Sequence, residues 1–291
     1  MSTPPSFTTL TRAEWAALAE PADRSGRGSG GRGLIPPSEI DAVYAPFSQL
    51  LRRSMKRRPA SSDHQATYLI GVAGGVSVGK STIGGLLQHL LAEGPDHLEV
   101  GSVSTDGFLY PNAELERRGL LAGKGCPESY DVARLVRFLG ELKSGRPEVV
   151  APVYSHRTYD VVADQIQSFH SPDVLIIEGV NVLDTTSGGP PFMVDLLDYS
   201  VYVDADEADI ERWYGQRFVA LCAAARQDNG SFYHHFAAMS TDQIERLAER
   251  VWRDVNGPNL RAHVLPTRDR ADLILEKGPD HSVRRIRVRN R

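Results

Sequence analysis

Residues 74–82 read Gly74-Gly75-Val76-Ser77-Val78-Gly79-Lys80-Ser81-Thr82, which matches the phosphate-binding pattern G-x-x-x-x-G-K-[ST]. The preceding run 68–73, YLIGVA, is apolar and partly β-branched, as a buried parallel strand is. The residues that follow place Ile83, Leu86, Leu87, Leu90 and Leu91 at helical spacing. This order of strand, loop and helix predicts a P-loop, and argues against a glycine-rich turn without a ligand.

The residue types of this stretch suit the binding of nucleotide phosphates. Gly74 and Gly79 permit backbone angles that let several N–H groups turn inward toward an anion. Lys80 offers a compact positive charge to the β- and γ-phosphates, and the Ser81 hydroxyl is placed to bind Mg²⁺. The chain has only five lysines, at 56, 80, 124, 143 and 277, against 28 arginines. Lysine at position 80 therefore indicates a site where a point charge fits better than a planar guanidinium.

The composition limits the class of protein. With 291 residues and 41% hydrophobic residues, the chain is long enough for one large α/β domain or two small ones. A net charge of −4 gives no general attraction to nucleic acid or to anionic membranes. No run approaches the length of a membrane span, and no secretory signal is visible. Two cysteines, Cys126 and Cys222, are too few for a disulfide scaffold, so we expect reduced thiols in the cytoplasm.

The first 33 residues differ in composition from the rest. Thr11-Arg-Ala-Glu14 fits a helix-capping box, but residues 21–33, PADRSGRGSGGRG, contain nothing to bury. We expect residues 1–33 to be a flexible segment, with an Arg/Gly tail that touches RNA as the alternative. Residues 34–291 are expected to form a single domain.

Two acidic residues follow predicted strands. Asp106 follows the strand near 98–103, and Glu178 follows the apolar run 174–177. Ligands of open α/β sheets bind beyond the carboxyl ends of the strands. Asp106 is therefore either a base that accepts a proton from an attacking hydroxyl or a residue that caps a turn, and its position alone leaves both open. Glu178 suits a Walker-B carboxylate that holds Mg²⁺.

The second half of the chain supplies further candidate residues. A helix is expected over 207–226, and its Arg217 stands in an apolar stripe, which is costly unless the charge is paired or faces an anion. Residues 149–160 are expected to form a polar-aromatic loop that lines a site, and 231–236 an aromatic cluster. A helix over 241–254 is expected to break at Asn256-Gly-Pro-Asn259, before closing strands at 273–275 and 283–288.

Several motifs together resemble bacterial type I pantothenate kinase. They are the P-loop itself, Ser-Thr-Asp-Gly-Phe (104–108), Pro-Glu-Ser-Tyr-Asp (127–131), Ala-Pro-Val-Tyr-Ser-His (151–156), Ile-Glu-Gly-Val-Asn (177–181) and Leu-Pro-Thr-Arg (265–268). The resemblance runs from about Leu34 to the C-terminus. It implies a P-loop kinase fold, a mostly parallel sheet flanked by helices, in a homodimer that phosphorylates pantothenate with MgATP at the first step of coenzyme A synthesis.

The resemblance also implies roles for individual residues. Asp106 is the expected base, with Lys80 and Arg217 acting on the transferred phosphate and Ser81 and Glu178 holding Mg²⁺. The nucleotide is expected against residues 74–82 and His281. The expected pantothenate site is lined by Lys124, Tyr154, His156, Tyr214, Arg217, Tyr233, Phe236 and Asn259.

The chain also departs from the family pattern. Gly85 stands where the family has an arginine that contacts phosphate and takes part in inhibition by coenzyme A, so we expect weak inhibition. Cys126 stands where an aromatic residue is usual. Two alternatives stay open: a P-loop kinase for another hydroxyl substrate, such as uridine kinase or phosphoribulokinase, and a non-catalytic relative that senses ATP or coenzyme A.

Overall fold

The chain forms a seven-stranded sheet in a computed structural model that describes residues 5–18, 35–57, 66–186 and 189–290. The strand order is β1-β9-β8-β7-β2-β6-β3. The strands are β1 (Phe7–Thr11), β2 (Tyr68–Gly74), β3 (Val100–Ser104), β6 (Val174–Gly179), β7 (Tyr199–Asp204), β8 (Leu273–Lys277) and β9 (Val283–Arg289). The five strands from β8 to β3 are parallel, and β9 and β1 are antiparallel additions at one edge. The predicted α/β class with a mostly parallel sheet is confirmed.

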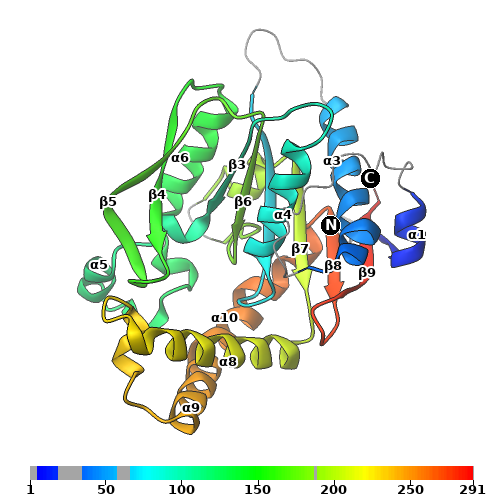
Figure 1. Ribbon diagram of the computed structural model, residues 1–291. Coiled ribbons are helices and arrows are strands. Elements are labelled where there is room, and N and C mark those ends of the chain that lie inside the picture. Colours follow the sequence, from blue (N-terminus) through cyan, green and yellow to red (C-terminus); the bar gives the residue numbers. More distant parts are fainter. Residues whose placement is uncertain (1–4, 19–34, 58–65, 187–188, 291) are drawn as a thin grey trace.

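Helices cover the sheet and extend beyond one end of it (Figure 1). The longer ones are α3 (Ala45–Lys56), α4 (Lys80–Ala92), α6 (Val132–Lys143), α8 (Glu207–Ala224) and α9 (Thr241–Val251). The shorter ones are α1 (Arg12–Ala17), α2 (Pro37–Glu39), α5 (Asn112–Arg117), α7 (Met193–Leu196) and α10 (Gly257–Asn259). Figure 1 shows α8 and α9 side by side below the strands.

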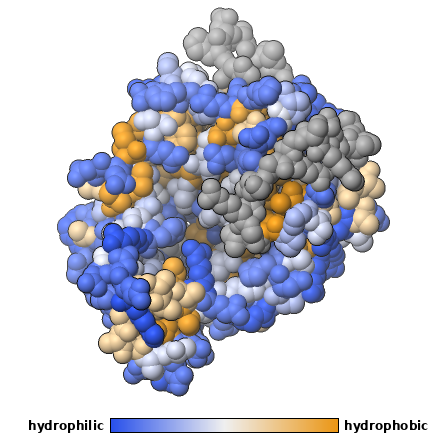
Figure 2. Space-filling view, in the orientation of Figure 1, coloured by the Kyte–Doolittle hydropathy of each residue, from blue (hydrophilic) through white to orange (hydrophobic). Residues whose placement is uncertain are grey.

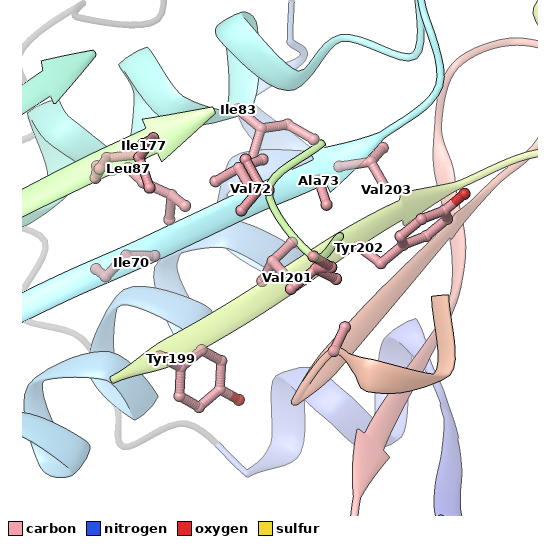
Figure 3. Close-up of a cluster of buried hydrophobic side chains, with 14 of the residues drawn as sticks. Ile70, Val72, Ala73, Ile83, Leu87, Ile177, Tyr199, Val201, Tyr202 and Val203 are labelled. Carbon is pink, nitrogen blue, oxygen red and sulfur yellow. The ribbon is translucent and has the colours of Figure 1, made fainter. Parts of the chain in front are cut away.

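The core is built around β2, the strand that leads into the P-loop. Every residue of β2 is buried, as is every residue of β6 beside it. Ile70 and Val72 lie among Val201 and Val203 of β7 and Ile83 and Leu87 of α4 (Figure 3). A central parallel strand is covered on both faces, which explains why YLIGVA reads as a continuous apolar run and not as an alternating one.

The expected flexible segment over residues 1–33 is wrong for its first described part. β1 pairs with β9 from Phe7↔Arg289 to Thr11↔Arg285, so the first strand belongs to the sheet. The predicted capping box of Thr11 and Glu14 is present and begins α1. Trp15 of α1 is only 3% exposed and its indole Nε1 donates to the carbonyl oxygen of Val43 at 2.9 Å. Residues 21–33 lie outside the described residues.

Two other segments that were expected to be irregular form regular secondary structure. Residues 149–160 are a hairpin and not a loop, because β4 (Val149–Ser155) pairs with β5 (Asp160–Phe169) as a separate two-stranded sheet. The helix that begins at Thr241 does not break at Asn256. It continues as π-helical turns at Trp252–Asn256 and Leu260–Val264 with α10 between them. Pro258 has no backbone N–H to donate, and the wider π-helical turns on either side of α10 let the helix continue without that hydrogen bond.

The face shown in Figure 2 is largely hydrophilic, and its hydrophobic side chains form separate patches. Among the described residues, the helices include none with the length and apolar character needed to cross a membrane.

Candidate active site

The P-loop has the backbone that its glycines predict. Gly74 has a φ of +144° and Gly79 a φ of +91°, both in the region that L-residues avoid. A Cβ on Gly74 would lie 2.5 Å from the carbonyl oxygen of Val203, so the loop can approach β7 only with glycine there. Gly79 precedes α4, whose N-terminal N–H groups and dipole favour an anion. The Lys80 ammonium donates to the carbonyl oxygen of Gly75 at 2.7 Å.

A cavity of about 390 Å³ opens in front of the P-loop. Its lining contains most of the residues singled out from the sequence: Val76, Ser77, Lys80, Ser81, Asp106, Lys124, Tyr154, His156, Glu178, Tyr214, Arg217, Tyr233, Phe236 and Asn259. Gly74, Gly75, Val78, Gly79, Thr82 and His281 are not among its lining residues. The structure thus brings together side chains from α4, α8, β6, the β4–β5 hairpin and the turns after β3.

Two oxygen-bearing side chains meet beside the P-loop, at the start of α4. The Ser81 hydroxyl donates to Oε1 of Glu178 at 2.9 Å. Ser81 is the second residue of α4 and Glu178 is the penultimate residue of β6, the strand next to β2. Parallel neighbours end at the same edge of a sheet, which is why residues about 100 positions apart meet here.

Asp106 lies in the short 3-10 turn Thr105–Phe108 that follows β3. The turn packs directly on the end of β6. The approach is so close that a Cβ on Gly179 would lie 1.9 Å from the Thr105 hydroxyl, so only glycine fits there. The Tyr130 hydroxyl donates to Oδ1 of Asp106 at 3.4 Å. Burial, and then the negative charge of Glu178, raise the pKa of Asp106, while His156, Lys80 and Tyr130 oppose the rise.

Lys124 is held over the aromatic residues of the hairpin. Its ammonium donates to Oδ1 of Asn112 at 2.7 Å and to the carbonyl oxygen of Tyr159 at 2.5 Å. The same nitrogen lies 4.4 Å from the Tyr159 ring centre and 5.0 Å from that of Tyr154. Burial lowers the pKa of Lys124 to about 8, although Asp160 and Asp106 favour its charged form. A charged lysine with only neutral hydrogen-bond partners is suited to receive an anion.

Arg217 reaches the cavity from α8 and is exposed. No hydrogen bond or ion pair to Arg217 occurs among the described residues. Its α8 neighbour Arg212, by contrast, pairs with Asp209 at 2.7 Å. Arg217 therefore carries an unpaired positive charge into the cavity that also holds Lys80 and Lys124.

Aromatic residues form another part of the cavity lining. Tyr159 stacks on Phe232 with ring centres 4.7 Å apart, and Tyr154 meets His156 edge to face at 5.2 Å. Tyr233 packs against Phe218 of α8, so the cluster 231–236 joins the hairpin to the helix. Asn259 donates to the carbonyl oxygen of Gly125 at 3.0 Å, and its buried Oδ1 has no partner within the described part of the chain. A buried amide oxygen without a donor suits a ligand that brings one.

His281 lies apart from the cavity, in the turn between β8 and β9. Its ring stacks on Trp213 of α8 with centres 3.8 Å apart and an interplanar angle of 22°. His281 is exposed, and its backbone has a φ of +65°. His281 thus packs on α8 and is not among the residues that line the cavity.

Sequence reasoning missed two tyrosines of the cavity and one nearby lysine: Tyr130, Tyr159 and Lys277. Tyr130 lies inside the quoted motif 127–131, and Tyr159 inside the polar-aromatic stretch 149–160, so both carried a signal. Their contacts with Asp106 and Lys124 depend on tertiary packing that spacing does not show.

The fold and the site together define a P-loop kinase, and comparisons with known proteins agree. The phosphoribulokinase and uridine kinase family model matches residues 69–213. A protein from Silicibacter has a TM-score of 0.64 at 25% identity over 79% of this chain and 97% of its own. The D-glycerate 3-kinase from Cryptococcus neoformans has a TM-score of 0.60 at 17% identity, over 81% and 96% of the two chains, and this likeness shows the fold alone.

Sequence relatives define the family more closely. The pantothenate kinase of Sorangium cellulosum is 47% identical over 270 residues, which cover 86% of this chain and 85% of the relative. That of Myxococcus xanthus is 46% identical over 98% and 97% of the two chains. The chain belongs to the pantothenate kinase family.

Proposed function

We propose that this enzyme transfers the γ-phosphate of ATP to pantothenate and forms 4′-phosphopantothenate, the first step of coenzyme A synthesis. The observation that carries the proposal is one shared cavity, lined by Asp106, by P-loop residues, by the Ser81–Glu178 pair and by two further cations, Lys124 and Arg217. The name of the relatives supports pantothenate as the acceptor, and their kinase family supports ATP as the donor.

The geometry supports an in-line transfer. Asp106 accepts the proton of the primary hydroxyl of pantothenate while the hydroxyl oxygen attacks the γ-phosphorus, and ADP leaves. The P-loop N–H groups and Lys80 hold the nucleotide phosphates. Arg217 and Lys124 neutralise the charge of the transferred group, because both are free of carboxylate partners in the described chain. Tyr154, His156, Tyr214, Tyr233, Phe236 and Asn259 line the acceptor side.

Magnesium fits the oxygen atoms that the chain offers. The Ser81 hydroxyl and the Glu178 carboxylate already lie 2.9 Å apart, and Mg²⁺ takes oxygen ligands with several waters and phosphate oxygens in its shell. Ser81 and Glu178 would hold the ion, which supplies charge neutralisation at the phosphates.

A turnover assay tests this proposal. ADP release from MgATP is measured with pantothenate, with uridine and without acceptor. We expect release that depends on pantothenate, and we expect Asp106→Asn to lower kcat by about 100-fold or more while ATP affinity changes little. Normal turnover by Asp106→Asn would show that Asp106 is not the base. Release with uridine alone would assign another acceptor, and binding of ATP without release would favour a non-catalytic sensor.

Coenzyme A is the proposed feedback inhibitor, but a weak one. A Cβ on Gly85 would meet nothing within 4 Å, so the second turn of α4 presents open space and no charge beside the P-loop. We expect little competition by coenzyme A against ATP, and Gly85→Arg to strengthen it. Tight competition in the unmodified chain would contradict the role given to Gly85.

The remaining proposals concern the molecule as a whole. We propose one kinase domain in a cytoplasmic homodimer, with neither nucleic acid nor membrane as a partner. Cys126 and Cys222 are both free thiols, which fits a reducing compartment. Sedimentation equilibrium tests the dimer.

A further inference from the structure

Asn112 is held at three points beside Lys124. It is the first residue of α5 and is half-buried. Its Oδ1 accepts from the Lys124 ammonium at 2.7 Å, and its Nδ2 donates to the carbonyl oxygen of Tyr159 at 3.1 Å. Its backbone N–H donates to Oδ1 of Asp160 at 2.9 Å. The two side-chain bonds fix which way the amide faces, because a flipped amide would turn its NH₂ group toward the ammonium and its oxygen toward a carbonyl.

The carbonyl oxygen of Tyr159 completes this arrangement. It accepts both from Nδ2 of Asn112 and from the ammonium of Lys124. Tyr159 has a φ of +54°, which is uncommon for an aromatic residue, and its ring is stacked on Phe232. A backbone conformation of this kind persists only where the surroundings fix it. The acceptor that Tyr159 presents to Lys124 and Asn112 therefore has a defined position.

The acid with the greatest influence on Lys124 does not pair with it. Burial lowers the pKa of Lys124, and Asp160 is the first of the two acids that oppose this effect. Oδ1 of Asp160, however, accepts two backbone N–H groups, one of them that of Asn112. No carboxylate forms an ion pair with Lys124 in the described part of the chain, whereas Lys143 pairs with Asp198. A neutral amide thus takes the position beside the ammonium that a carboxylate takes at Lys143.

We propose that Asn112 is a positioning residue for the transfer reaction: its neutral amide orients the Lys124 ammonium and leaves the positive charge available to the transferred phosphate. A carboxylate at the same position would also orient the ammonium, but it would balance its charge. This inference rests on the proposed function, in which Lys124 neutralises the charge of the transferred group. The structural alternative is that Asn112 only joins α5 to the β4–β5 hairpin and has no effect on the chemistry.

Asn112→Asp tests the role of the neutral amide. The carboxylate keeps an acceptor of nearly the same size and adds a negative charge, which favours the charged form of Lys124 and raises its pKa. We therefore expect the alkaline decline of kcat to move to higher pH. We also expect kcat near pH 7 to fall by about tenfold, because the charge of the ammonium is already balanced, while KM for ATP and for pantothenate changes by less than about threefold. ADP release from pH 6 to 10 measures these quantities.

Three further variants isolate the added charge. Asn112→Ala loses both side-chain bonds without adding a charge, so kcat should fall but the alkaline decline should not move up. Asn290→Asp makes the same change at the β1–β9 edge, where Asn290 bonds to Ser6 and Thr8, and should leave kcat and the pH profile unchanged. Lys124→Arg is charged at every accessible pH, so adding Asn112→Asp to it should lower kcat without any shift in pH.

Other outcomes would overturn the inference. If Asn112→Asp keeps the kcat and the alkaline decline of the original chain, the neutral amide has no role in the reaction. If Asn112→Ala moves the decline up as far as Asn112→Asp does, hydration of the site explains the shift and the charge does not. If the two variants lose kcat equally and neither shifts the decline, Asn112 has only its structural role.

Two checks keep these results distinct from a failure of the fold or of the proposed function. A thermal melt shows whether each variant is folded, and the first turn of a helix tolerates an acid. If Asn112→Asp does not fold, Asn112→Ala decides: a lower kcat at unchanged KM supports the positioning role, and an unchanged kcat overturns it. Absence of pantothenate-dependent ADP release by the original chain would refute the proposed function itself, which is a different result.

Discussion

At the scale of single residues, burial in the site raises the pKa of an acid and lowers the pKa of a base, so both values move toward neutral pH. Burial raises the pKa of Asp106 and lowers that of Lys124, because both charged forms lose contact with water. Asp106 has to be deprotonated to accept a proton, and Lys124 has to be protonated to neutralise phosphate charge. Both conditions hold together only within a limited range of pH, which predicts a bell-shaped activity profile.

The alkaline side of that profile leads to a prediction for Lys124. Its pKa of about 8 means that the ammonium is charged below pH 8 and neutral above it, so activity should fall as pH rises through about 8. Lys124→Arg stays charged at every accessible pH and should lose this decline, with a lower kcat because the guanidinium fits the site less well. The measurement is kcat against pH from 6 to 10. An unchanged alkaline decline in Lys124→Arg would assign it to another group, Lys80 first.

At the scale of elements, α4 is weakened where it leaves the P-loop. Gly84 and Gly85 lie in its second turn, and each glycine lowers helix stability relative to alanine. Gly84 is buried and faces Ile176 of β6, whereas Gly85 is exposed. The helix that carries Lys80 and Ser81 thus depends on packing against the sheet more than on its own propensity.

Gly85→Ala should therefore stabilise the protein. The added Cβ meets nothing within 4 Å, so we expect about 1 kcal/mol of extra unfolding free energy and a rise in Tm of about 2 °C. Urea unfolding followed by circular dichroism measures the change. Gly74→Ala is the opposite control, since its Cβ would lie 2.5 Å from the carbonyl oxygen of Val203 and should destabilise. A stability loss in Gly85→Ala would mean that the glycine is needed for the path of the helix.

Elements differ in how far the sequence predicts them. β2, α4 and β6 were predictable because a buried strand and a P-loop helix each leave a local pattern. The hairpin β4–β5 was not, because Pro152 and the polar residues of β5 hide the alternation of a strand that packs outside the main sheet. The π-helical turns around Pro258 were also missed, since a proline ordinarily ends a helix and the compensating turns depend on tertiary packing.

At the scale of the whole molecule, the N-terminal strand and helix complete the fold instead of preceding it. Trp15 packs into the main core and bonds to Val43, and β1 covers β9. Local strand propensity could not reveal this pairing, because the five residues of β1, FTTLT, form a strand only with β9, which lies at the far end of the chain. The candidate site was more accessible to sequence reasoning, since its residues follow motifs, although the contacts of Tyr130, Tyr159 and Lys277 required the fold.

Trp15→Ala tests whether this part of the chain is structural. Removal of a buried indole and its hydrogen bond should lower the free energy of unfolding by about 3 kcal/mol or more. Leu18→Ala is the matched control, because Leu18 is 58% exposed and should change stability by less than about 0.5 kcal/mol. Equal stability of the two variants would mean that α1 adds nothing to the core.

The pairing of β1 with β9 has a consequence for how the protein is made. The carbonyl oxygen of Ser6 accepts the N–H of Asn290 at 2.9 Å, so two residues 284 positions apart are neighbours. During synthesis the first strand leaves the ribosome long before its partner exists. The P-loop and its strands can assemble in the meantime, but the edge of the sheet closes only after the last residues emerge. A ribosome that stalls or terminates early would release a chain with an unpaired β8 edge, open to association with other chains.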